Sequence, residues 1–152
     1  TCPYTSITVM GDADRLEKVY ASILLNAIKF SEANKKIQVS LRKRDTFAEF
    51  QVIDEGVGIA KDFLPHIFER FRQADSSLTR KFGGLGLGLS LVQHLVHGHT
   101  GAIDASSEGF GQGSTFTVTI PIATHEQIGQ DINQSNKRND FGSLSVDSPV
   151  HH

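Results

Sequence analysis

The first half of the chain switches between the periodicities of helix and strand. After the capping residue Asp12, apolar residues recur every three or four positions, which predicts a helix over residues 13–30. Two stretches of apolar and polar alternation follow, at residues 37–42 and 49–52, and the polar residues 44–46 separate them. Alternation on both sides of a short polar turn predicts a β-hairpin.

The second half repeats helix and strand patterns around a long irregular stretch. A short helix is predicted near residues 61–67, and the polar, glycine-punctuated residues 72–85 predict a long loop. Apolar residues at helical spacing then predict a second long helix over residues 87–98. Two further alternating stretches, residues 102–105 and 116–120, predict the last two strands.

This order of elements predicts an α+β fold. Helix, two strands, helix, helix and two strands suit a two-layer α/β sandwich, in which a mixed, mostly antiparallel sheet carries three helices on one face. From Ile122 onward, Gln, Asn, Ser, Asp and Gly dominate, and large apolar residues are few. We therefore expect one domain over residues 1–121 and a flexible tail or linker over residues 122–152, without a packed core.

Composition narrows the classes of function. The chain has 152 residues and a formal net charge of −2, so it lacks the basic surface that nucleic acid or an anionic membrane requires. A single cysteine fits a reducing compartment, and no apolar run approaches the ~20 residues of a membrane span. We expect a cytoplasmic domain without direct membrane contact, which is compatible with a membrane-anchored parent protein.

The first candidate cluster lies on the first predicted helix. At about 100° per residue, Ser22, Asn26 and Lys29 form one polar stripe, and Phe30 lies at its border with the apolar face. The amide oxygen of Asn can ligate Mg²⁺, and Lys can neutralise phosphate oxygens. The alternative is an ordinary solvated face of an amphipathic helix.

The second cluster follows a predicted strand. Asp54 ends the strand, and Gly56 and Gly58 follow it, so a flat ligand can approach the backbone closely. An Asp carboxylate accepts a hydrogen bond from the exocyclic amine of adenine, whereas guanine presents a carbonyl at that position. The alternative is a simple strand-to-helix turn, where Asp and Gly are common.

The third cluster is the glycine-rich run at residues 83–88, which leads into a predicted helix. Glycines ahead of a helix N-terminus expose backbone N–H groups to an anion such as phosphate. The run matches neither the Walker A loop nor G-x-G-x-x-G, whose last position is Leu89 here. The alternative is a flexible loop with a glycine-rich cap. Residues 111–115 form a weaker candidate, in which hydroxyls can contact phosphate or simply close a hairpin.

Three histidines lie near the end of the second long helix, and one hypothesis is that they bind a metal ion: His94, His97 and His99. Cys2 is remote, and no H-E-x-x-H motif is present. We therefore expect these histidines to face the negative end of the helix dipole.

Taken together and in order, these clusters resemble the catalytic ATP-binding domain of sensor histidine kinases, within the gyrase, Hsp90, histidine kinase and MutL group of ATPases with the Bergerat-type fold. Residues 72–77 particularly resemble hybrid kinases, which carry a receiver domain in the same chain. The matching segments are the N box at residues 26–31, the G1 box at 54–58, the F box at 68–71, the G2 box at 84–89 and the G3 segment at 111–115.

The resemblance implies roles for individual residues. Asn26 would ligate Mg²⁺, Lys29 would meet phosphate, Phe30 would pack on adenine, and Asp54 would read its amine. Gly56 and Gly58 would make room for the base, and residues 72–85 would form a lid over ATP. The implied catalytic residues are Asn26, Lys29 and Ser22, with Asn26 as the metal ligand. The implied ATP-binding residues are Asn26, Lys29, Phe30, Asp54, Gly56, Gly58, Ile59, Phe71, Gly84, Leu85, Gly86, Leu87, Gly88 and Thr115.

The implied reaction is transfer of the ATP γ-phosphoryl group to a histidine on a separate dimerisation domain, expected upstream of Thr1, with a response regulator receiver domain as a further partner. Two departures from the family stand out. Ser22 occupies a position where Asn, Asp, Glu or His is usual, and Gln73 stands where many members carry Arg. Ser22 therefore keeps open a degenerate nucleotide-binding or protein-interaction module with weak or no kinase activity. A serine kinase of the anti-sigma type is a third reading.

Overall fold

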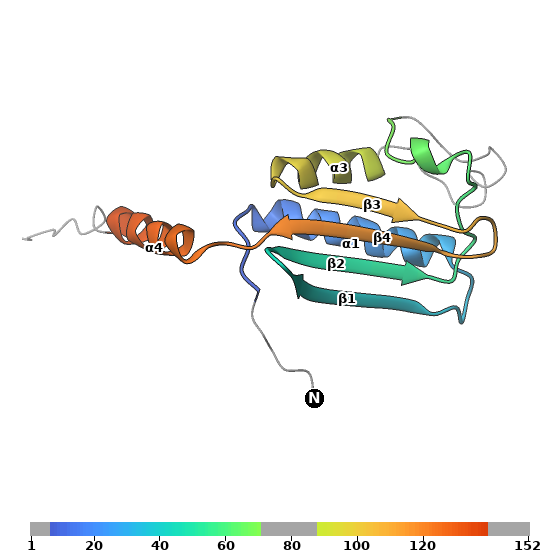
Figure 1. Ribbon diagram of the computed structural model, residues 1–152, viewed down its shortest axis with the longest axis horizontal. Helices are drawn as coiled ribbons and strands as arrows, with labels where there is room; N and C mark the ends of the chain where they lie inside the picture. The colour runs from blue at the N-terminus through green and yellow to red at the C-terminus, as the bar shows by residue number, and fades with distance from the viewer. Residues whose placement is uncertain (1–6, 71–87, 140–152) are drawn as a thin grey trace, which may run out of the picture. The chain divides into compact units, whose positions relative to one another are not determined.

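A four-stranded antiparallel sheet organises the chain, in the order β1-β2-β4-β3 (Figure 1). The computed structural model describes residues 7–70 and 88–139, and the chain divides into two compact units, residues 1–122 and 123–152. All pairs of neighbouring strands in the described residues are antiparallel. The strands are β1 (Ile37–Arg44), β2 (Phe47–Asp54), β3 (Ala102–Ser106) and β4 (Ser114–Pro121).

The predicted hairpin is confirmed, and its strands are longer than predicted. β1 and β2 pair from Ile37 with Asp54 to Arg44 with Phe47, so only Asp45 and Thr46 form the turn. Asp45 has a φ of 53°, in the left-handed region, which Asp tolerates better than most residues.

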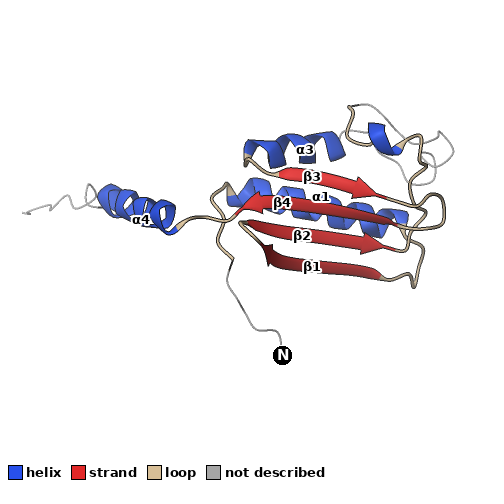
Figure 2. Cartoon of the chain, viewed as in Figure 1, coloured by secondary structure: helices blue, strands red, loops and turns tan. Residues whose placement is uncertain are grey.

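Two long helices lie against the sheet. Helix α1 (Ala13–Phe30) begins at Asp12, whose carboxylate accepts a hydrogen bond from the Arg15 backbone N–H at 3.0 Å. Helix α3 (Gly88–Gly98) contacts both α1 and β3, and α1 contacts β2. Figure 2 shows α1 behind the strands and running along them. The predicted short helix is one 3₁₀ turn, η1 (Leu64–His66), because Pro65 at its start donates no backbone hydrogen bond.

The core lies between the helices and one face of the sheet. The buried side of α1 repeats at the predicted three- and four-residue spacing, while alternate residues of β2 and β4 meet it. Burying a Val, Leu or Ile side chain stabilises a fold by about 1.5–3 kcal/mol. The buried members are Leu16, Val19, Ile23, Ala27, Phe50, Val52, Val92, Val96, Phe116, Val118 and Ile120.

The opposite face of the sheet is polar. Gln51 of β2 donates a hydrogen bond to the Thr117 hydroxyl at 3.2 Å. Glu49 is buried beneath two arginines of β1, with Arg42 at 2.6 Å and Arg44 at 3.1 Å. The Arg42 guanidinium first, and Arg44 after it, holds the pKa of the Glu49 carboxyl below its usual value. This face therefore carries no second apolar layer, as the two-layer prediction requires.

The second unit contains a helix that the sequence pattern did not predict, α4 (His125–Asn139). Thr124 and Gln127 cap its start. The Thr124 hydroxyl accepts from the Gln127 N–H at 3.4 Å, and the Gln127 side chain accepts from the Thr124 N–H at 2.9 Å. This capping box stabilises a helix start even in a polar segment. None of the α4 side chains that the structure describes is buried.

Candidate nucleotide site

Four segments meet at one end of the sheet: the end of α1, the loop after β2, the loop between β3 and β4, and the start of α3 (Figure 1). We call residues 55–60 the G1 loop and residues 107–113 the β3–β4 loop. The Val57 N–H donates to the last carbonyl of α1, at Phe30, over 3.0 Å. Gly111 and Gly113 donate to the Val57 and Gly56 carbonyls at 2.8 and 3.2 Å. The G1 loop is therefore held from both sides by backbone hydrogen bonds.

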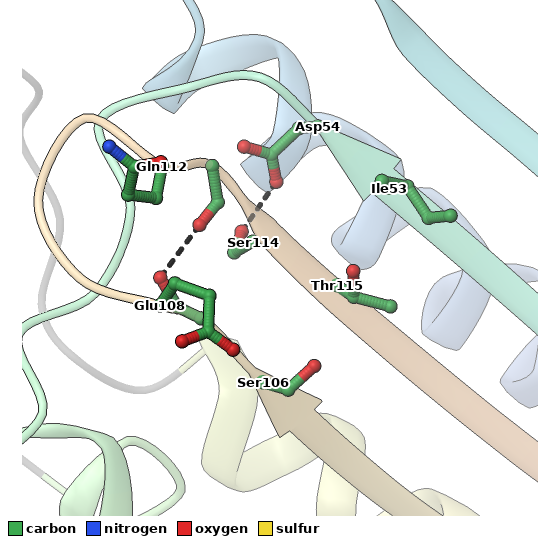
Figure 3. A pocket seen from close by; sticks show the side chains of 9 residues that line it. Ile53, Asp54, Ser106, Glu108, Gln112, Ser114 and Thr115 are labelled. Carbon is green, nitrogen blue, oxygen red and sulfur yellow. Dashed lines mark hydrogen bonds between the residues drawn. The ribbon is translucent and has the colours of Figure 1, made fainter.

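Asp54 is the buried carboxylate of this site, with 5% of its surface exposed. Its Oδ1 accepts from the Gly56 N–H at 2.8 Å, and its Oδ2 accepts a short hydrogen bond from the Ser114 hydroxyl (Figure 3). The β2–β4 register pairs Asp54 with Ser114, which fixes the orientation of the carboxylate. Because an ionised carboxylate has about four acceptor positions, it can still accept from a further donor.

The glycines of the G1 loop are required by contacts within the protein. A Cβ on Gly56 would overlap the Phe30 carbonyl oxygen, and a Cβ on Gly58 would overlap the Gly109 carbonyl oxygen. Gly58 also has a φ of 70°, which L-residues rarely adopt. The sequence assigned Gly56 and Gly58 to making room for a base, and the structure gives them this additional packing role.

The predicted polar stripe of α1 lies beside the start of α3. Ser22, Asn26, Lys29 and Phe30 are each half-buried. The Lys29 ammonium lies 5.4 Å from the centre of the Phe30 ring, within cation–π range. A Cβ built on Gly88 would lie 3.8 Å from the Ser22 hydroxyl oxygen, so α1 and the last G2 glycine are neighbours.

Two further predicted residues lie on opposite sides of the sheet. Ile59 is half-buried against the core. Thr115 alternates with the core-facing Phe116, and it therefore points toward the polar face with its partners Ile53 and Ser106. Ser114, one residue earlier, is the hydroxyl that reaches Asp54. Phe71, Gly84, Leu85, Gly86 and Leu87 lie outside the described residues, as do residues 72–85.

A cavity of about 180 Å³ opens beside Asp54 at this end of the sheet (Figure 3). Ligand pockets usually span about 300–1,000 Å³, so this cavity alone does not hold a nucleotide. Its lining is mostly polar and consists of Ile53, Asp54, Ser106, Ser107, Glu108, Gln112, Gly113, Ser114 and Thr115.

Sequence reasoning missed two serines that organise the site. Ser114 was grouped with hydroxyls for phosphate, but the alternation of buried Phe116, Val118 and Ile120 places it on the same face as Asp54. Ser107 carried no motif, and its hydroxyl accepts from the Ile59 N–H at 2.9 Å. The period of the last strand was the available signal for Ser114, whereas no local pattern marked Ser107.

The histidine cluster contains a structural residue. The Nδ1 of His99 lies 2.7 Å from the Leu95 carbonyl in the last turns of α3, as the helix-end prediction expects. Its Nε2 accepts from the Asp12 N–H at 3.0 Å. His99 thus joins the end of α3 to the start of α1. In the described ranges 7–70 and 88–139, no three His, Cys, Asp or Glu side chains gather in a way that could hold a metal ion.

Comparison with known proteins identifies the class. The family model for histidine kinase-, DNA gyrase B- and HSP90-like ATPases matches residues 11–124, so the chain belongs to this family. Within it, the chain is a histidine kinase-type ATPase domain, which confirms the resemblance and the α+β fold predicted from the sequence. Over the described residues, no helix has the length and apolar character needed to cross a membrane.

Individual relatives support this placement. A hybrid signal transduction histidine kinase D from Dictyostelium discoideum is 40% identical, over 75% of this chain and 9% of its own length. A structure of the mycobacterial sensor histidine kinase MprB is 30% identical with a TM-score of 0.68, covering 75% of this chain and 76% of that one. Full-length ShkA in complex with AMPPNP is 34% identical with a TM-score of 0.67, covering 78% of this chain and 24% of that one. The chain thus spans a small part of the full-length relatives.

Proposed function

We propose that this domain binds Mg-ATP and transfers the γ-phosphoryl group to a histidine on a separate dimerisation and phosphoacceptor domain. The observation that carries the proposal is the buried Asp54 carboxylate, oriented by Ser114 and Gly56 at the end of the sheet where α1 and α3 also meet. A buried acceptor with both oxygens fixed suits the adenine amine. Family membership and the ShkA complex with a nucleotide analogue agree with an ATP site.

The adenine ring would lie between Asp54 and the half-buried side chains of Phe30 and Ile59. Both Asp54 oxygens accept from protein donors, and the carboxylate would select a base that presents a further donor. Guanine presents a carbonyl there, which would leave two acceptors facing each other. The proposal therefore includes selectivity for adenine over guanine nucleotides.

The polar stripe of α1 would meet the phosphates and Mg²⁺. The Asn26 side chain is half-buried on this stripe, and its amide oxygen would serve a hard cation. Mg²⁺ typically combines one or two protein oxygens with substrate phosphates and water, which fits this donor set better than a protein-only cage. Lys29 would neutralise phosphate charge. Gly88 would allow the backbone N–H groups at the start of α3 to face the phosphates. Ser22 would contact phosphate or ordered water there.

The remaining predicted contacts fall on residues outside the described ranges. We propose that residues 72–85 close over the nucleotide as a lid, with Phe71 at its base and Gly84, Leu85, Gly86 and Leu87 at its end. Thr115 stays a weaker member of the proposed site, since its side chain lies toward the polar face of the sheet.

The reaction would be an in-line phosphoryl transfer. ATP supplies the phosphoryl group, and the acceptor histidine nitrogen attacks phosphorus while ADP leaves. The chain's own residues would position the triphosphate and offset its developing charge, which is the main contribution of proteins to such transfers. The same proposal includes two partners, the dimerisation domain and a receiver domain as in hybrid kinases, and it includes a cytoplasmic location. It includes no nucleic acid and no direct membrane contact.

Calorimetry of Mg-ATP binding to Asp54→Asn tests the adenine contact. The amide would place an N–H₂ group against a donor, and a hydrogen bond to a charged group is worth about 1.5–3 kcal/mol. We expect affinity to fall roughly 10- to 150-fold. Asp104→Asn is the matched control, because this substitution removes the same charge at an exposed position of the edge strand β3.

Phosphotransfer in trans tests the reaction itself. The domain, a supplied dimerisation domain and labelled ATP should give phosphohistidine above background. Unchanged ATP affinity in Asp54→Asn would refute the adenine contact. ATP binding without any phosphohistidine would refute the kinase activity. A large gain of phosphotransfer in Ser22→Asn would then show that Ser22 is the reason for the missing activity.

A further inference from the structure

The Ser107 hydroxyl joins two segments that are distant in sequence. It accepts from the Ile59 N–H of the G1 loop at 2.9 Å and donates to the Gly113 carbonyl at 2.7 Å. It also accepts a longer hydrogen bond from the Gly109 N–H at 3.3 Å. The Gly109 carbonyl lies 3.4 Å away as a second, weaker acceptor for the same hydroxyl proton. A hydroxyl has one donor and two acceptor positions, so these contacts use its full capacity.

Each of the two segments that Ser107 joins leads to a group that donates a hydrogen bond to Asp54. On one side, the G1 loop contains Gly56, whose N–H donates to Asp54 Oδ1. On the other side, Gly113 directly precedes Ser114, whose hydroxyl donates to Asp54 Oδ2. Together with the Gly113–Gly56 backbone hydrogen bond, Ser107 therefore helps to hold the two groups that orient the buried carboxylate.

The same hydroxyl lies beside a close approach of the two loops. Gly58 leaves no space for a Cβ beside the Gly109 carbonyl, so the two backbones touch next to the Ser107–Ile59 hydrogen bond. A serine that merely closes its own turn would bond within its loop. The bond from Ser107 to Ile59 instead spans 48 residues, which makes it a tertiary contact.

We propose that Ser107 is a positioning residue for adenine recognition, which acts through Ile59 and Asp54 without touching the nucleotide. This inference rests on the proposed ATP site. Loss of the hydroxyl would free the Ile59 N–H and the Gly113 carbonyl, so the G1 loop would be held less firmly at Ile59, while the Gly111–Val57 and Gly113–Gly56 hydrogen bonds remain. The base would then meet Ile59 and Asp54 in a wider range of positions.

Two measurements on Ser107→Ala test this role, with Ser107→Thr as the variant that keeps the hydroxyl. Amide hydrogen exchange should accelerate at Ile59 at least tenfold, while core amides such as that of Val118 keep their native rates. Mg-ADP affinity, measured by calorimetry well below the melting temperature, should fall about five- to tenfold. Ser107→Thr should stay within twofold of the native chain in both.

Ser40→Ala is the matched control, because Ser40 lies within β1 opposite Gln51, away from both loops and from the cavity beside Asp54. It should leave exchange and affinity unchanged. Native Mg-ADP affinity in Ser107→Ala, or equal losses in Ser107→Ala and Ser107→Thr, would overturn the positioning role. If the native chain itself binds no adenine nucleotide, the proposed function fails, whereas the exchange result still reports whether Ser107 anchors the G1 loop.

Discussion

The contact between Gly58 and Gly109 allows a quantitative prediction for Gly58→Ala. An L-residue at a φ of 70° costs about 1–2 kcal/mol of strain. The added Cβ would also displace the Gly109 carbonyl and with it the Gly111–Val57 and Ser107–Ile59 hydrogen bonds. Each such bond contributes about 0.5–1.5 kcal/mol. Together these terms predict a loss of about 2–5 kcal/mol in the free energy of unfolding.

Gly111→Ala separates the two contributions. Gly111 has a φ of 74°, close to that of Gly58, but a Cβ there would meet no atom within 4 Å. The free energy of unfolding of Gly111→Ala should therefore fall only by the cost of backbone strain, about 1–2 kcal/mol. Urea unfolding of both variants gives the comparison, since a domain of this size has a slope of about 1–3 kcal/mol per molar urea.

The two variants should also differ in nucleotide binding. Gly58→Ala should weaken Mg-ADP binding, because the G1 loop moves, whereas Gly111→Ala should change it by less than twofold. Equal losses of stability in the two variants would show that the loop contact contributes nothing, and the reasoning from backbone approach would be wrong.

Two further predictions concern side chains outside the nucleotide site. Arg42 lowers the pKa of Glu49, so the stability that Glu49 provides is full above the usual carboxyl pKa and disappears as the pH falls through the lower folded value. Urea midpoints of Glu49→Gln should thus lie below native at pH 7 and approach native as the pH falls well below the usual carboxyl pKa. His99→Ala should lower the melting temperature by about 4 °C, as expected for about 1 kcal/mol in a unit of this size, because the Asp12 N–H loses its acceptor. Scanning calorimetry against His94→Ala, an exposed neighbour on α3, checks this, and equal shifts would contradict it.

Local patterns predicted the elements well, for identifiable reasons. Helix α1 begins and ends where predicted, because Asp12 caps it and its apolar spacing is regular. The 3₁₀ turn at Pro65 was predicted as a longer helix, since apolar spacing alone does not register the missing N–H. Helix α4 was missed because polar composition outweighed the signal from Thr124 and Gln127.

The candidate site was predicted only in part, because its geometry is non-local. Asp54 stood out beside two glycines, but the serine that orients it comes from a strand 60 residues later. The contact from Ser107 to Ile59 depends on loops that meet only when the sheet forms. Strand register, rather than residue type, decides that Ser114 reaches Asp54 and that Thr115 points away.

Asp54 and Ser114 form the last residue pair between β2 and β4. Strand ends fray more readily than strand centres, so the pair that we propose to recognise the base is also the first to open. If that proposal holds, base selectivity depends directly on the stability of this end of the sheet. A substitution that loosens the end of either strand should let guanine nucleotides compete better, even when it lies far from the base and leaves the global unfolding free energy nearly unchanged.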